Sequence, residues 1–180
     1  MLASCAVRWS VGDRIMTAAA KRIQARVGDV FRVPFGAAQH AYGQVVGQTG
    51  PQNLVVVFRA THATVEDAMR SGIELAAIVF DAKFRNGDWP ILTNLPPVKV
   101  AEPWFVLGHE GLENLRLQNF DGSKTQLVRS GVAAKHEHRS LSYPMALQMA
   151  VEAVHGRREW NPDMEGYRKL ANELSGAPAV

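Results

Sequence analysis

Hydrophobic and polar positions alternate along residues 27–35, where every second side chain falls on the same side of an extended chain. This two-residue period is typical of a β-strand, and Pro34 lacks a backbone donor, so we expect it at a strand end or a sheet edge. Residues 42–46 and 54–59 form two more short apolar segments, and glycine-bearing loops separate the three. The pattern predicts an antiparallel meander that curls into a barrel-like N-terminal sheet.

The middle of the chain combines one short helix with further strands. Thr64 and Asp67 have the spacing of a capping box and Gly72 is a favourable stop, which together predict a helix over residues 65–70. Residues 74–80 are an almost continuous apolar run of strand length, as expected for a central buried strand. Turn-forming residues dominate 83–90, prolines keep the following segment extended, and residues 104–107 and 115–117 are expected as short strands.

The last quarter of the chain changes to a helical period. Pro144 in a first turn and Gly156 as a stop delimit one helix, and Asn161 as a cap before Pro162 begins another, which Gly176 ends. Apolar side chains recur at helical spacing in both segments: Leu147, Ala150, Val151 and Val154 in the first, and Met164, Tyr167, Leu170, Ala171 and Leu174 in the second. Met145 lies outside the first stripe, on a face with Met149 and Glu152.

These elements predict one α+β domain over residues 26–176. In it, the short helix and the two C-terminal helices pack against the curled antiparallel sheet. Residues 1–25 show little alternation and contain an alanine run and a basic pair, so we expect a flexible N-terminal extension. A short amphipathic helix around residues 16–23 is the alternative for that segment.

Composition narrows the class of protein. The chain has 180 residues, of which 47% are hydrophobic and 21% charged, as in globular proteins. Its formal net charge is +3, without the clustered basic stripe of a dedicated DNA binder. The single cysteine, Cys5, excludes an intrachain disulfide and a zinc site built on several thiolates. No apolar run approaches the about 20 residues of a membrane span, and no basic segment precedes the mildly apolar start, so we expect a cytoplasmic protein.

Candidate catalytic and metal-binding residues are few. His136 and His138 flank Glu137, and two imidazoles on one strand face can reach one ion. No third ligand stands at a diagnostic spacing, so an exposed connection without a metal is favoured. His109 has no sequence neighbour that would tune its pKa for acid–base catalysis. No phosphate-binding loop or dinucleotide fingerprint occurs. We therefore expect no enzyme activity and no cofactor, and a hydrolase that uses these histidines is the least favoured interpretation.

A small nucleic-acid-binding module is the alternative function. Phe35, Tyr42 and Phe58 would stack on bases if the curled sheet exposed them. The basic residues available for phosphate contacts are Lys21, Arg22, Arg26 and Arg32. Aromatic residues make up only 8% of the chain, and a core of this size needs most of them, so nucleic-acid binding is disfavoured.

Trp89 and Trp104 are candidate anchors for a protein partner. Both lie in proline-bearing segments without a regular pattern, where a large aromatic side chain is often only partly buried. In the other interpretation, each closes one end of the core beneath the crossing of residues 96–97. For either tryptophan alone, that core role is slightly favoured.

Several short segments carry a family resemblance. Residues 27–34 (VGDVFRVP) and 41–45 (AYGQV) come first, followed by residues 87–96 (GDWPILTNLP) and 159–163 (EWNPD). Their order and spacing resemble the immunity protein 26 family of bacterial polymorphic-toxin systems, over about residues 26–175. Thr93 stands where a glycine is more typical of that family, and residues 1–25 have no counterpart in it.

The resemblance implies binding without catalysis. An immunity protein neutralises a cognate toxin domain in the cytoplasm of the producing cell, by covering its active site or blocking a required motion. This needs a rigid scaffold, a few desolvated anchors and complementary charge. The residues that we expect at the partner are Trp89, Trp104, Asp88, Glu66 and Asp67. A basic toxin would need a local acidic patch on this net-positive chain, formed either by Glu66, Asp67 and Glu74 or by Glu110, Glu113 and Asp121.

Overall fold

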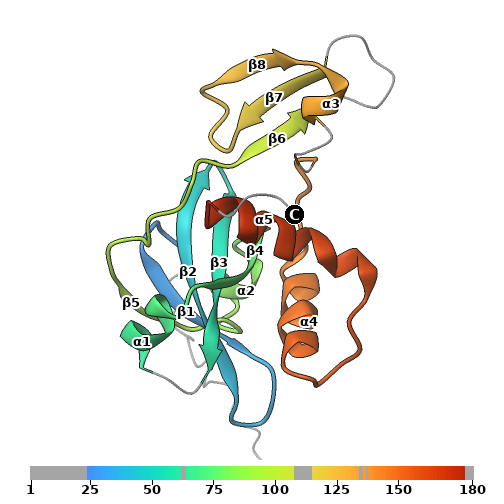
Figure 1. The fold of residues 1–180 in the computed structure, drawn as a ribbon. Coiled ribbons are helices and arrows are strands. Elements are labelled where there is room, and N and C mark those ends of the chain that lie inside the picture. Colours follow the sequence, from blue (N-terminus) through green and yellow to red (C-terminus); the bar gives the residue numbers. More distant parts are fainter. Residues whose placement is uncertain (1–23, 62–63, 108–114, 134–135, 137, 177–180) are drawn as a thin grey trace, which may run out of the picture.

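The computed structural model describes residues 24–61, 64–107, 115–133, 136 and 138–176. Figure 1 shows a larger sheet with helices around it and a smaller sheet at one end of the molecule. In chain order the elements are β1 (Asp29–Pro34), β2 (His40–Thr49), β3 (Gln52–Thr61), α1 (Val65–Arg70), β4 (Ile73–Phe80), α2 (Ala82–Arg85), β5 (Ile91–Asn94), β6 (Trp104–Leu107), β7 (Leu115–Asn119), β8 (Thr125–Val128), α3 (Ser130–Ala133), α4 (Pro144–Val154), the 3-10 turn η1 (Pro162–Met164) and α5 (Glu165–Leu174).

The larger sheet confirms the predicted antiparallel meander. Its five strands are ordered β4-β3-β2-β1-β5, and every neighbouring pair is antiparallel. The sheet stays open instead of closing into the barrel-like form that the sequence suggested, because its two edge strands do not pair with each other. At the β5 edge, the strand has only four residues and follows directly on Pro90.

The strand predicted over residues 74–80 is β4 (Ile73–Phe80), which lies at an edge of the sheet and not at its centre. The strand is nevertheless buried over most of its length, since hydrophobic clusters cover both of its faces. Its outer side is shielded in part by the chain before α4, where the Ser142 backbone N–H donates to the Ile78 carbonyl at 2.9 Å. The continuous apolar run therefore indicates that both faces of the strand are buried, and it does not indicate whether the strand is central or at an edge.

Two hydrophobic layers sandwich the larger sheet. On one face, β1 to β4 pack against α2, α4 and η1, and the buried residues from those helical segments are Phe84, Leu147, Ala150, Val151 and Met164. On the other face, β2 to β4 pack against α1 and α5, which contribute Ala68, Leu170, Ala171 and Leu174. The two C-terminal helices thus lie on opposite faces of the sheet, and the predicted α+β class is confirmed.

Two of the predicted helix starts are confirmed by side-chain caps. Thr64 Oγ1 accepts a hydrogen bond from the Asp67 backbone N–H at 3.2 Å and begins α1. Asn161 Oδ1 accepts from the Asp163 N–H at 2.9 Å, and the turn η1 precedes α5. Such caps satisfy backbone donors that a helix start leaves unpaired. The sequence patterns missed four short elements, α2, β5, β8 and α3, each of only four residues.

The smaller sheet has the strand order β6-β7-β8 and is attached to the body through two aromatic side chains. Phe105 of β6 and Phe120, just after β7, belong to the same hydrophobic cluster as β3 and β4. Phe120 lies against β2 at Gly47, where an added Cβ would meet its ring at 3.2 Å. A backbone hydrogen bond of 2.7 Å from Ala101 to Leu174 also holds the connecting segment to α5.

The N-terminal boundary can be followed only from residue 24. Ala25 is fully buried, and its carbonyl accepts a 3.0 Å hydrogen bond from the side chain of Gln48. The folded body therefore includes Ala25, one residue before the predicted boundary, and the predicted extension lies otherwise outside the described residues. Within the described residues, no helix is long and apolar enough to cross a membrane.

Candidate protein-binding surface

Trp89 belongs to the core and offers no surface to a partner. Its indole is fully buried, stacked on Phe31 with 5.5 Å between ring centroids, and edge-on to Phe84 at 5.6 Å. The indole N–H donates to Gln148 Oε1 of α4 at 3.4 Å. Aromatic rings arranged in this way stabilise a core through both area and geometry. The interpretation of Trp89 as a partner anchor is therefore replaced by the core role, because α2 and α4 close over it.

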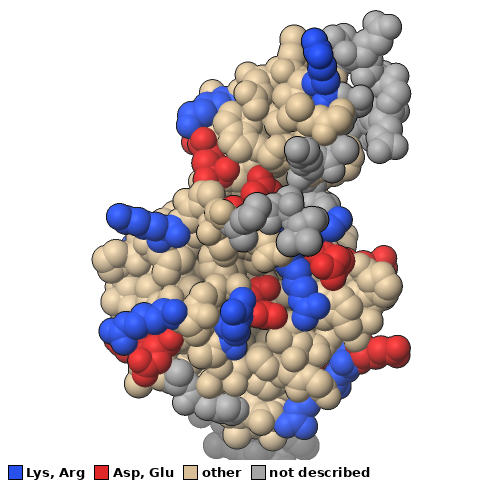
Figure 2. All heavy atoms as spheres, viewed as in Figure 1, with Lys and Arg blue, Asp and Glu red and all other residues tan. Residues whose placement is uncertain are grey.

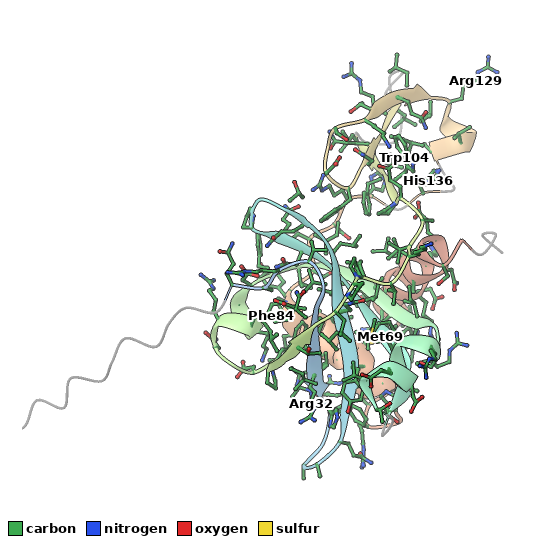
Figure 3. The ribbon with its side chains drawn as sticks, turned by 90° about the vertical axis from the view of Figure 1, so that its left-hand side faces the viewer. Arg32, Met69, Phe84, Trp104, Arg129 and His136 are labelled. Carbon is green, nitrogen blue, oxygen red and sulfur yellow. The ribbon has the colours of Figure 1, made fainter. Side chains whose placement is uncertain are left out.

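Trp104 lies at the start of β6 and is half-buried. Its side chain packs on a small cluster formed by the second sheet and α3, which consists of Val106, Leu115, Leu117 and Ala133. Its backbone N–H donates to Glu173 Oε1 of α5 at 3.1 Å, and His136 Nδ1 lies 3.2 Å from the same oxygen. Figure 3 shows Trp104 and His136 in this part of the molecule. The residue thus joins the second sheet to α5 and keeps only part of its ring accessible.

The predicted acidic patches do not form a continuous acidic surface in the described residues. Glu66 and Asp67 are exposed on α1, and Asp67 pairs with Arg70 at 3.2 Å. Glu74 is held between Arg59 at 3.0 Å and Arg168 at 3.9 Å. On the face shown in Figure 2, acidic and basic side chains are likewise interspersed. Of the second predicted acidic patch, Asp121 is exposed, and residues 110 and 113 lie outside the described part of the chain.

Asp88 stays at the surface beside Trp89. Its carboxylate bonds to Lys83 Nζ at 3.0 Å, and the Trp89 backbone N–H donates to the Lys83 carbonyl at 3.1 Å. These contacts close the loop between α2 and β5. An exposed ion pair of this kind contributes little stability, so Asp88 remains available to a partner.

The candidate catalytic residues do not converge on one another. The His136 imidazole hydrogen-bonds with the Glu173 carboxylate on α5. The His138 side chain is exposed, and its backbone forms a parallel β-bridge with Val106 of β6. No group of three potential metal ligands comes together within the part of the chain that the structure describes. Residues 5, 109 and 137 lie outside that part.

The aromatic residues of the nucleic-acid interpretation are buried. Phe35, Tyr42 and Phe58 expose less than a tenth of their surface, because both faces of the sheet are covered. Tyr42 and Phe58 belong to the layer beneath α1 and α5, and Phe35 to the layer beneath α4. They cannot stack on bases in this fold. Arg26 and Arg32 are exposed, but they lack the aromatic platform expected beside them.

An exposed apolar surface lies where the sequence analysis did not place one. It consists of Phe80 at the end of β4 and of Leu141, Tyr143 and Met145 at the start of α4, and we call it the Tyr143 surface. Tyr143 is 80% exposed, Met145 50%, and Leu141 and Phe80 37% each. The parallel bridge between Val79 and Ser142 brings the two segments alongside each other. Large apolar side chains that gather outside the core typically mark an interaction site.

Local structure explains why these side chains point outward. Tyr143 occupies the cap position of α4 in an extended conformation and makes no side-chain cap hydrogen bond. Pro144 in the first turn is buried and fixes the direction of the helix, so Leu147, Ala150 and Val151 face the sheet. Met145 stands outside that stripe, as its position in the sequence already indicated. The sequence signal for this surface was an aromatic residue at a position that normally carries a polar cap.

A small hollow adjoins the Tyr143 surface. It has a volume of about 120 Å³, and its lining includes Ile78, Phe105, His138, Ser142 and Tyr167. Its lining is mixed, with Asp163 among its polar side chains, and its volume suits a single inserted side chain better than a drug-sized ligand, which needs at least about 300 Å³. A second, more open hollow of about 310 Å³ lies beyond the other end of α4, beside Phe35 and Arg157.

The chain was compared with protein-family models, with curated proteins and with solved structures, and none of them matches.

Proposed function

We propose that this protein is a non-catalytic immunity protein that binds a cognate bacterial toxin domain in the cytoplasm and neutralises it by occlusion. The observation that carries the proposal is the Tyr143 surface, where four large apolar side chains are exposed at a strand end and a helix start. Tyrosine is among the residues most enriched at the energetic centres of protein interfaces. A preformed surface of this kind binds with a small cost in conformational entropy.

The segments that resemble the immunity protein 26 family support this assignment in an indirect way. Their most distinctive side chains are used inside the fold: Phe31 and Trp89 stack together, and Gln44 is fully buried. Asn161 caps the turn before α5. A pattern that specifies a scaffold leaves the contact surface free to vary, as expected in proteins that each recognise a different toxin.

The proposal is tested by copurification with the product of a toxin-type gene encoded beside this one. The wild-type chain is expected to form a one-to-one complex. Leu141→Asp places a charge in the Tyr143 surface and is expected to weaken the complex by at least about tenfold, because a buried unpaired charge is costly. Tyr143→Ala is expected to act in the same direction by removing the most exposed anchor.

Leu92→Asp is the matched control, because Leu92 on β5 is also 37% exposed but lies outside the Tyr143 surface. Its complex should be as tight as that of the wild type, and all variants should keep the wild-type melting temperature. Equal binding by Leu141→Asp and Leu92→Asp would contradict a role of the Tyr143 surface in binding the toxin. Failure of the wild-type chain to bind the toxin would contradict the proposed function itself.

A further inference from the structure

The small hollow beside the Tyr143 surface is bounded by several separate parts of the chain. Its volume is about 120 Å³, and its lining comes from β4, β6, the segment at residues 138–142, η1 and α5. Figure 1 shows β6, β4 and α5 meeting beneath the second sheet. Ile78, Phe105 and Leu170 are buried members of the lining, while Ser140 and Asp163 are exposed. The hollow thus offers apolar contact and polar groups to the same ligand.

Three small residues leave this hollow open. Ala76 and Ala77 of β4 line it, and they lie between Leu75 and Ile78 in a strand of otherwise large side chains. Gly166 also lines it, in the first turn of α5, where an added Cβ would meet nothing within 4 Å. A glycine inside a helix is less favourable than an alanine. Packing therefore does not require a glycine here, and its absence of a side chain keeps the hollow accessible.

The segment before α4 directs polar side chains into the hollow. His138, Ser140 and Ser142 all line it. Arg139, which lies between two of them, turns away and donates to Gln52 Oε1 at 2.8 Å. Alternate side chains of an extended segment point to opposite sides. Within the described residues, the hydroxyl groups of the two serines make no hydrogen bond, so both are available to a ligand.

The carboxylate of Asp163 places a negative charge at the hollow. Asp163 is exposed on η1, and no lysine or arginine in the described part of the chain pairs with it. It is also not used as a helix cap, because Asn161 caps this turn. Arg168, the next arginine along the chain, is held by Glu74 at 3.9 Å and lies 3.9 Å from the centre of the Trp160 ring. A cation from outside can therefore pair with Asp163 without displacing an existing ion pair.

These groups fit a primary ammonium at the end of an unbranched apolar stem. An ammonium has three donors, and the carboxylate and the two serine hydroxyls supply matching acceptors, whereas a guanidinium presents five donors. The methylene groups of a lysine pack along apolar surface while its charge stays near water. A free diamine would need a second carboxylate for its other end, and Asp163 is the only carboxylate among the described residues of the lining.

We propose that this hollow binds the side chain of a lysine from a partner protein. The ammonium would lie at Asp163 and the serine hydroxyls, and the stem against Ile78 and Phe105. The inference rests on the proposed function only for the origin of the lysine, which we expect in the protein that covers the neighbouring Tyr143 surface. Its test uses no toxin, so failure of this inference and failure of the proposed function are distinguishable.

The test is a titration of the full isotope-labelled chain with blocked tripeptides, followed in NMR spectra through the amides of Ser142 and Gly166. The first peptide is Ala-Lys-Ala, and it should shift both amides saturably. In the second peptide norleucine replaces lysine, which keeps the straight carbon chain and removes the ammonium. The second should need about fivefold more peptide for half-saturation, since it lacks the ion pair.

Two variants locate the binding. Asp163→Asn should remove the preference for lysine over norleucine. Glu165→Gln is the matched control, because Glu165 is an exposed carboxylate of the same helix start that does not line the hollow, and the preference should be retained. Gly166→Leu should fill the hollow and abolish the shifts at Ser142 with either peptide, and it provides the decision if Asp163→Asn does not fold.

Four results would overturn the proposal. These are shifts that do not saturate, an equal response of the wild-type chain to both peptides, binding that Gly166→Leu leaves unchanged, and tighter binding of another cation than of the lysine peptide. The other cations to be titrated are 1,5-diaminopentane, which represents a free diamine, and the matching arginine peptide.

Discussion

Gly43 shows how a short sequence motif is fixed by packing. It lies on β2 opposite Phe31 of β1, and a Cβ added there would come within 2.5 Å of the Phe31 ring and 2.8 Å of the Val56 carbonyl oxygen. Phe31 in turn stacks on Trp89 and meets Phe84 edge-on at 4.9 Å. The glycine is therefore required because aromatic side chains fill the space above it.

Replacing this glycine should cost stability. Gly43→Ala is expected to lower the free energy of unfolding by at least about 2 kcal/mol, because both the ring and the backbone would have to move. Gly166→Ala in α5 is the control, since an added Cβ there meets nothing within 4 Å and alanine favours the helix by up to about 1 kcal/mol. Urea unfolding measures both. Equal stability of the two variants would contradict the packing argument.

Glu102 gives the molecule a defined response to acid. Its carboxylate accepts hydrogen bonds from Lys124 at 2.7 Å and Asn119 at 2.9 Å, and these hold the pKa of Glu102 below its ordinary value of 4.5. A carboxyl whose pKa is lower in the folded state stabilises the fold above the unfolded pKa, and this contribution is lost as the pH falls through the folded pKa. The contacts join the segment before β6 to the turn between β7 and β8.

Removing the Glu102 charge should make the stability of the protein depend less on pH under acidic conditions. The wild-type chain is expected to lose stability as the pH falls below about 4.5, and Glu102→Gln should lose less over the same range. Part of the slope should remain, because hydrogen bonds from Ser123 also lower the pKa of Asp121. Melting temperatures between pH 6 and 3 measure the effect. A wild-type slope in Glu102→Gln would show that the carboxylate is not involved.

At the scale of elements, periodic segments were predictable, whereas of the five four-residue elements only β6 was predicted. The first three strands, the helix over residues 65–70 and the two C-terminal helices were predicted because their periods or caps are strong. β5 and β8 have four residues each, too few to show a period. They exist because neighbouring strands supply backbone partners: β1 pairs with β5, and β7 with β8. Such pairing is tertiary information that a local pattern does not contain.

Gln44 links two elements that the sequence analysis treated separately. Its side-chain N–H group lies 3.2 Å from both the Leu95 and the Pro96 carbonyl oxygens, and its oxygen accepts from the Val98 N–H at 2.9 Å. The proline-rich segment after β5 is thus held across the sheet by one buried amide. The prolines predict that the segment after β5 is extended, but they do not predict that the Gln44 side chain binds it.

Gln44→Met should uncouple this segment at nearly constant side-chain volume. Leaving the Val98 N–H and the carbonyl groups without their partner is expected to cost about 3 kcal/mol. Hydrogen exchange at the Val98 amide should accelerate in the variant more than exchange in α4. Gln126→Met, at an exposed position on β8, is the control and should change neither quantity. Unchanged exchange at Val98 in Gln44→Met would rule out this role.

At the scale of the whole molecule, the sequence led to a proposal of binding but did not predict which large side chains are exposed. Trp89 was proposed as an anchor because it lies in an irregular segment, yet α2 and α4 close over it. Tyr143 directly precedes the predicted helix that begins at Pro144, and the sequence analysis assigned it no role. Exposure of Tyr143 depends on where the segment before α4 meets β4, through the bridge between Ser142 and Val79. That contact spans more than sixty residues of sequence, so the local pattern contains only the unusual aromatic residue at the cap position.

We propose that the protein neutralises its partner by covering it and not by chemistry. The most direct measurement is the residual activity of the cognate toxin domain at a fixed toxin concentration, titrated with this protein and followed over time. Occlusion predicts a linear fall to zero at one equivalent, with no further change on incubation. Complete and progressive loss of toxin activity at a small fraction of one equivalent would show turnover, and would contradict the claim.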